Sequence, residues 1–181
     1  MMHSIFLILI IALLSVQNIY CVCRAKNIQS MYGVQTDVPF DVFSGLKIAY
    51  VQPYLDATTS DVLQGTKSNC SADSIACVGC FLNEQNAVIQ IAACGNCKAI
   101  FTETPLNTPN LVNGVYWYET PSFSFGFSNS SLIDQNKADY LEAYSDARVS
   151  WYIDTYYGGF RCGSNRYLSN DNSWMKIIYT S

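Results

Sequence analysis

The number and placement of cysteines constrain the fold of this chain more than any other feature. Eight cysteines are present, and six lie beyond residue 25: Cys70, Cys77, Cys80, Cys94, Cys97 and Cys162. In an oxidising compartment, an even number of cysteines favours complete pairing. We therefore expect a disulfide-stapled fold in which these six residues form three bridges. The spacing alone does not choose among the possible connectivities.

The N-terminal segment predicts which compartment the cysteines meet. Residues 5–16 are almost continuously apolar, which suits a secretion signal and is short of the roughly 20 residues of a membrane span. We predict a signal peptide over residues 1–23, cut after Cys23 or Ala25, because either cut leaves six cysteines. Residues 24–181 are then expected to form a single secreted domain without a membrane span. An uncleaved anchor is the alternative.

Composition and charge argue against several function classes. The only histidine, His3, lies within the predicted signal, so the mature protein would lack the commonest general base and metal ligand. The chain carries 10 basic and 14 acidic residues without a basic patch, which argues against nucleic acid as a partner. We expect no cofactor and no metal, and favour a non-enzymatic protein over an enzyme.

Alternating apolar and polar residues predict β-strands. Residues 123–127 and 149–153 alternate with the period of a strand that buries one face, which makes Trp151 a core residue. Val115, Trp117 and Glu119 share one face of a further strand. Shorter apolar runs within residues 26–68, and residues 176–179, add more strands. The prediction is an all-β fold, mostly antiparallel, arranged as a sandwich or jelly roll.

Three segments differ from one another in composition. A cysteine-rich segment covers residues 70–97, and an aromatic-rich β segment covers residues 114–181. Within the latter, residues 131–147 place apolar side chains at helical spacing behind a capping-box pattern at Ser131 and Asp134. We therefore expect one short helix near residues 131–147.

Two Cys-x-x-Cys motifs, Cys77 to Cys80 and Cys94 to Cys97, have the spacing of a four-thiolate zinc site. Behind a signal peptide we favour structural disulfides over zinc. Residues 92–98 also resemble the active-site segment of the thioredoxin family, in which Cys-Gly-x-Cys-Lys opens a helix. The resemblance covers about seven residues and implies that Cys94 attacks a disulfide and Cys97 resolves the intermediate.

The C-terminal part combines aromatic rings with carboxylates and amides, as carbohydrate sites do. The candidate ligand-binding residues are Asp154, Tyr156, Tyr157, Arg161, Asn165 and Trp174. We predict a secreted, non-enzymatic protein that binds an extracellular ligand, with carbohydrate as the best candidate. One alternative is a Cys-x-x-Cys thiol-disulfide oxidoreductase. Another is a structural extracellular or surface protein with no small-molecule ligand.

Two weaker patterns complete the candidates. The sequons at Asn69 and Asn129 predict N-glycosylation. Carboxylate-driven glycoside hydrolysis needs two acidic side chains. The candidates for that role are Asp139, Glu142, Asp146 and Asp154. We favour a solvated surface for these acids, because nothing in the sequence marks one as buried.

Overall fold

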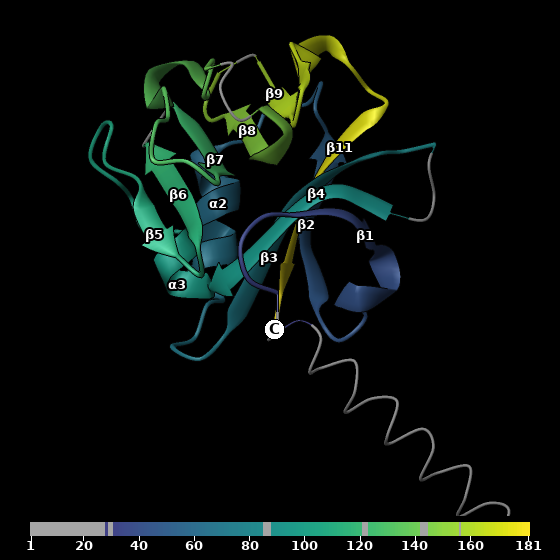
Figure 1. The fold of residues 1–181 in the computed structure, drawn as a ribbon, viewed down its shortest axis with the longest axis vertical. Helices are drawn as coiled ribbons and strands as arrows, with labels where there is room; N and C mark the ends of the chain where they lie inside the picture. The colour runs from purple at the N-terminus through teal and green to yellow at the C-terminus, as the bar shows by residue number, and fades with distance from the viewer. Residues whose placement is uncertain (1–27, 29–30, 85–87, 121–122, 142–144, 156) are drawn as a thin grey trace, which may run out of the picture.

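The computed structural model describes residues 28, 31–84, 88–120, 123–141, 145–155 and 157–181. The predicted signal peptide over residues 1–23, with its cleavage positions, lies outside these residues and stays a prediction. The described residues form two antiparallel β-sheets with short helices at their margins. The predicted fold class, mostly antiparallel β, is therefore confirmed (Figure 1).

The first sheet brings together strands from both ends of the described chain. It has five strands in the order β1-β4-β3-β11-β2, and all neighbours are antiparallel. The C-terminal strand β11 lies between β3 and β2, as the yellow arrow in Figure 1 shows. The strands are β1 (Gln35–Pro39), β2 (Lys47–Pro53), β3 (Ile75–Leu82), β4 (Val88–Asn96) and β11 (Trp174–Thr180).

The second sheet is a meander in which each strand pairs with its neighbours along the chain. Its six strands follow the order β10-β9-β8-β7-β6-β5, and they appear in green in Figure 1. The strands are β5 (Asn110–Val112), β6 (Val115–Thr120), β7 (Ser124–Ser128), β8 (Arg148–Tyr152), β9 (Gly159–Cys162) and β10 (Asn165–Arg166). A 3-10 turn, η4 (Leu168–Asn170), follows β10 and leads towards β11.

One apolar core lies between the two sheets. Val78 and Ile178 of the first sheet belong to the same buried cluster as Trp117, Phe125 and Trp151 of the second. The Phe125 and Trp151 rings lie 5.1 Å apart between centroids. Trp151 is fully buried, as its alternation with polar residues predicted. Burying such rings contributes the largest apolar areas available to a core.

Helix placement differs from the sequence-based prediction. The longest described helix, α2 (Ser60–Ser68), follows an N-cap at Thr59, whose hydroxyl accepts a hydrogen bond from the Val62 N–H. A second, α3 (Cys97–Ile100), is a single turn after β4. The segment at 60–68 was expected to consist of strands and turns. Its capping threonine and buried Leu63 are the signals of a helix.

The helix expected near residues 131–147 is wrong in position. That segment holds only two 3-10 turns, η2 (Gln135–Lys137) and η3 (Ser145–Ala147), while residues 142–144 lie outside the described residues. Ala138 and Asp139 adopt left-handed backbone angles, with φ of 47° and 58°. A right-handed helix cannot continue through such residues. Ile133 of this segment is buried, whereas Tyr140 and Leu141 are exposed.

All six predicted cysteines form disulfides, so the disulfide-stapled fold is confirmed. Cys77 and Cys94 face each other on neighbouring strands β3 and β4. The bridge from Cys80 to Cys162 joins β3 of the first sheet to β9 of the second. The third bridge joins Cys70, which follows α2, to Cys97, the first residue of α3. Three disulfides indicate an oxidising compartment, and none of the described helices is long and apolar enough to cross a membrane.

Candidate functional site

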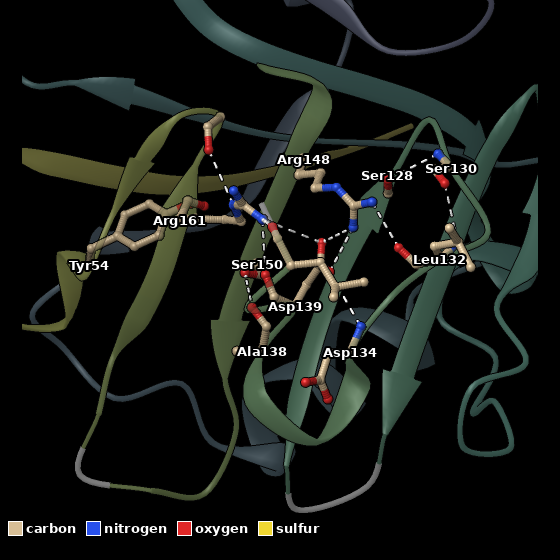
Figure 2. Close-up of polar contacts among 12 residues, drawn as sticks. Tyr54, Ser128, Ser130, Leu132, Asp134, Ala138, Asp139, Arg148, Ser150 and Arg161 are labelled. Carbon is tan, nitrogen blue, oxygen red and sulfur yellow. Dashed lines mark hydrogen bonds and ion pairs between the residues drawn. The ribbon is translucent and has the colours of Figure 1, made fainter. Parts of the chain in front are cut away.

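The outer face of the second sheet is polar, yet it is buried. Residues 129–141 and 145–147, here called the covering loop, lie over this face (Figure 2). At the centre, both carboxylate oxygens of Asp139 accept hydrogen bonds from Nη1 of Arg148, at 2.7 and 2.6 Å. Nη1 of Arg161 lies 3.9 Å from Oδ2 of the same carboxylate, and all three side chains are fully buried.

Several further hydrogen bonds from the sheet hold backbone carbonyls of the covering loop. Arg161 donates to the carbonyls of Asp139 and Leu141, at 3.0 and 2.5 Å. Nη2 of Arg148 donates to the Leu132 carbonyl at 2.8 Å. Ser150 donates to the Ala138 carbonyl at 2.5 Å. These bonds provide partners for backbone carbonyls in a loop that has little regular secondary structure of its own.

Electrostatics within the cluster follow from its burial. Burial raises the pKa of the Asp139 carboxyl, and the hydrogen bonds and charge of Arg148 oppose that shift. Burial likewise lowers the pKa of Arg161, which the charge of Asp139 opposes. No part of this cluster is exposed, so Asp139 and Arg161 join the covering loop to the sheet away from solvent.

A continuous group of aromatic rings lies on the surface beside this cluster. Phe160 of β9 is central: its ring centroid lies 5.7 Å from Tyr140, 5.4 Å from Tyr167 and 6.4 Å from Tyr152. Tyr152 in turn lies 5.7 Å from Tyr157. We call these five residues the aromatic patch. Tyr140, Tyr157 and Tyr167 are 45%, 51% and 60% exposed, so three rings of one group are open to solvent.

Polar groups surround the rings of the aromatic patch. The hydroxyl oxygens of Tyr140 and Tyr167 lie 2.8 Å apart and share a hydrogen bond. The Arg166 guanidinium carbon lies 5.8 Å from the Tyr167 ring centroid. Burial raises the pKa of Tyr152, and the nearby groups of Tyr157 and Asp134 add to that shift. The patch therefore combines aromatic faces with hydroxyl, guanidinium and carboxylate groups.

The predicted ligand-binding residues do not form one group. Tyr157 belongs to the aromatic patch, and Asn165 is exposed in β10, next to Arg166. Asp154 instead accepts the Ser60 N–H at the start of α2, at 2.8 Å. Trp174 is half-buried and packs against the core. Arg161 is buried, as described above, and Tyr156 lies outside the described residues.

Four residues of the aromatic patch were missed by sequence reasoning. Tyr152 was recognisable, because the alternation of residues 149–153 points it away from the core. Phe160 follows the predicted Tyr157 closely, and Tyr167 lies further along the same segment. Tyr140 lies within residues 131–147, where the apolar spacing predicts a helix that the described residues do not form. Only the folded covering loop brings its ring to Phe160.

The two cysteines of each Cys-x-x-Cys motif are not bonded to each other. Cys94 bonds to Cys77, and Cys97 bonds to Cys70, so neither Cys-x-x-Cys motif pairs its own two sulfurs. All four side chains are buried. A reactive dithiol at Cys94 and Cys97 would require opening two buried bridges. Over the described ranges, no three or more His, Cys, Asp or Glu side chains are grouped so as to hold a metal ion.

The remaining predicted positions are on the surface where the structure describes them. Asn69 and Asn129 are exposed, and the Asn69 side-chain amide donates to the Gly65 carbonyl at 3.0 Å. Asp146 is exposed, and Glu142 lies outside the described residues. No family model, no curated protein and no solved structure matches the chain.

Proposed function

We propose that this protein is a secreted, non-enzymatic binding protein that holds carbohydrate on the aromatic patch. The supporting observation is that three exposed tyrosine rings belong to one continuous group anchored on the buried Phe160. A sugar places its C–H face against an aromatic ring, while neighbouring polar groups hydrogen-bond its hydroxyls. Tyr140, Tyr167, Arg166 and Asp134 supply such polar groups.

The buried polar cluster supports this proposal because it fixes the patch from beneath. Tyr140 directly follows Asp139, and Phe160 directly precedes Arg161. The hydrogen bond from Arg161 to the Asp139 carbonyl therefore restrains the backbone that carries both rings. A ligand site that is already ordered loses less conformational entropy on binding. Weak sugar stacking benefits from such preorganisation.

The chemistry of the cysteines supports secretion and a non-redox role. Three disulfides fit an oxidising compartment, and the predicted signal peptide provides a route to it. The exposed sequons at Asn69 and Asn129 fit a glycoprotein. The oxidoreductase alternative requires a Cys94–Cys97 dithiol, whereas these residues bond to different partners.

A glycan array followed by calorimetric titration of the best hit tests the proposal. Tyr167→Ala removes the most exposed ring of the patch and should weaken binding about tenfold, which corresponds to about 1.4 kcal/mol. Tyr32→Ala is the matched control, because Tyr32 is 71% exposed and lies outside the patch. Its affinity should equal that of the parent protein.

Two results would overturn the proposal. If no glycan on the array binds, the result would favour the alternative of a structural surface protein without a small-molecule ligand. A glycan bound equally well by the parent protein and by Tyr167→Ala would show that the patch is not the binding surface.

A further inference from the structure

A pocket of about 310 Å³ lies on another part of the molecule, between the start of α2, the segment after α3 and the end of β6. Its acidic lining residues are Asp61, Glu103 and Glu119. Its apolar lining consists of Leu63 and Ile153, both almost completely buried. No positively charged side chain lines it among the residues that the structure describes.

Glu119 is the unusual member of this lining. It continues the row of Val115 and Trp117, whose side chains fill the core between the sheets. Glu119 is only 9% exposed, and its Oε2 atom has no hydrogen-bond partner among the described residues. A buried carboxylate oxygen without a partner is costly, because it has lost water and gained nothing in exchange. Glu119 also lines the pocket, so a ligand bound there lies next to this carboxylate.

Backbone pairing brings a second carboxylate to the same place. The Thr104 N–H donates to the Glu119 carbonyl at 3.0 Å, which holds the segment after α3 along β6. Burial raises the pKa of Glu119 to about 7, the Lys67 charge on α2 opposes this, and Glu103 adds to it. Glu103 and Lys67 are therefore the charged groups that act on Glu119 from the elements around it.

We propose that this pocket binds the ammonium group of a small alkylamine, with Glu119 as its direct partner and Glu103 or Asp61 as a second anion. An ammonium group has only donors, which is what an unpartnered carboxylate oxygen needs. The alkyl chain lies against Leu63 and Ile153. A diamine fits better than a monoamine, because three carboxylates line a pocket whose walls are otherwise partly apolar.

The proposal carries a pH dependence of definite sign. An ammonium group binds the ionised form of Glu119, and burial keeps much of that carboxyl protonated below its pKa of about 7. Affinity should therefore rise roughly tenfold between pH 6 and pH 8, as the ionised fraction of Glu119 increases. The amine itself stays protonated over this interval.

Titration calorimetry of the whole protein with cadaverine tests this assignment, with pentanediol as the neutral probe of equal length. We expect cadaverine to bind at pH 8 and pentanediol to bind at least tenfold more weakly. Glu119→Gln, which keeps the shape of the side chain, should weaken cadaverine at least tenfold at pH 8. Asp37→Asn is the control, because Asp37 is an exposed acid at the far edge of the first sheet.

The assignment is overturned if cadaverine gives no binding at pH 8, if pentanediol binds equally well, or if Glu119→Gln binds like the parent. The parent protein provides a test without substitution, since affinity that does not change between pH 6 and pH 8 also contradicts it. Tyr167→Ala should bind cadaverine normally. The amine-binding proposal is thus tested separately from the carbohydrate proposal.

Discussion

The two sheets bury their inner faces in the same way and their outer faces in opposite ways. The outer face of the first sheet is apolar, with Ile177 and Tyr179 beside the Cys77–Cys94 bridge. Phe43 stacks on the Tyr179 ring at 4.9 Å. The outer face of the second sheet instead presents Arg148 and other polar groups (Figure 2). The two outer faces differ because one is covered by backbone carbonyls that need hydrogen-bond donors and the other by apolar side chains.

The covering loop explains the polar face. Its backbone makes few regular hydrogen bonds, so its carbonyls at Leu132, Ala138 and Leu141 need donors from the sheet. Arginine and serine supply those donors, and Asp139 balances the charge that arginine brings. On the first sheet, the short turn η1 (Phe40–Phe43) and its neighbours bring apolar side chains. These side chains need no hydrogen-bond donors from the sheet, so an apolar sheet face can pack against them.

The largest expected effect concerns the bridge that joins the two sheets. Cys80→Ala with Cys162→Ala opens a bridge that spans 82 residues, whereas Cys77→Ala with Cys94→Ala opens one that spans 17 within the first sheet. Loop-closure entropy predicts losses of about 4.5 and 3 kcal/mol in the free energy of unfolding, respectively. Urea denaturation of both double variants measures the difference. Equal losses would mean that sequence separation does not decide the contribution.

Removing the anion of the polar face should cost nearly as much. Asp139→Ala leaves Arg148 and Arg161 buried without their counter-charge, and should lower the free energy of unfolding by about 3 to 4 kcal/mol. Asp146→Ala is the control, because Asp146 is exposed in the same loop, and it should change stability little. Denaturant titration compares them. A loss below 1 kcal/mol for Asp139→Ala would show that the cluster does not stabilise the fold.

A buried lysine provides a pH-dependent test on the first sheet. Lys176 of β11 is fully buried, and its Nζ donates to the Asp56 carbonyl and the Thr58 hydroxyl, at 2.7 and 2.8 Å. Burial lowers the pKa of Lys176 from 10.5 to about 7, and the Asp56 charge opposes this. Between those values the unfolded chain binds a proton that the native state lacks. The free energy of unfolding should therefore rise with pH over that interval.

The expected increase is about 2 to 3 kcal/mol between pH 7 and pH 9. Lys176→Met should abolish most of it, while Lys47→Met, at an exposed position of β2, should retain it. Urea denaturation at several pH values provides the measurement. The interval ends below pH 10 because burial raises the pKa of Tyr54 and Tyr118, which makes stability fall with pH once tyrosines ionise in the unfolded chain.

The smallest expected effect contrasts one side chain from each outer face. Ser150→Ala removes the donor to the Ala138 carbonyl, and Ile177→Val removes one methylene from the apolar face. Each should cost about 1 kcal/mol. Hydrogen exchange separates them, because only Ser150→Ala should accelerate the exchange of amides in the covering loop. The same exchange pattern in both variants would contradict a local role for Ser150.

The sequence predicted those features that depend on periodicity and compartment. The alternation around Trp151 marked a strand and its buried face. The predicted signal peptide, together with six cysteines after it, indicated three bridges. The meander of β5 to β10 follows from neighbouring strands joined in order. These signals are local along the chain, or concern composition, so a single sequence contains them.

The polar cluster and the aromatic patch were not predictable in the same way. The sequence favours a solvated position for Asp139, because charged residues are usually exposed. The burial of Asp139 and Arg148 depends on a covering loop whose left-handed residues interrupt an otherwise helical pattern. Likewise, Tyr140 reaches Phe160 only after that loop has folded. Contacts between distant segments decide both features.

The position of β11 has a consequence for the order of assembly. Residues 174–180 follow every other strand along the chain, yet they separate β3 from β2 in the first sheet. During synthesis, the chain therefore cannot close this layer until those residues are available. Until then, the edges of β3 and β2 that β11 will occupy remain unpaired. A chaperone that binds unpaired strands would therefore have the most time to act on these two edges.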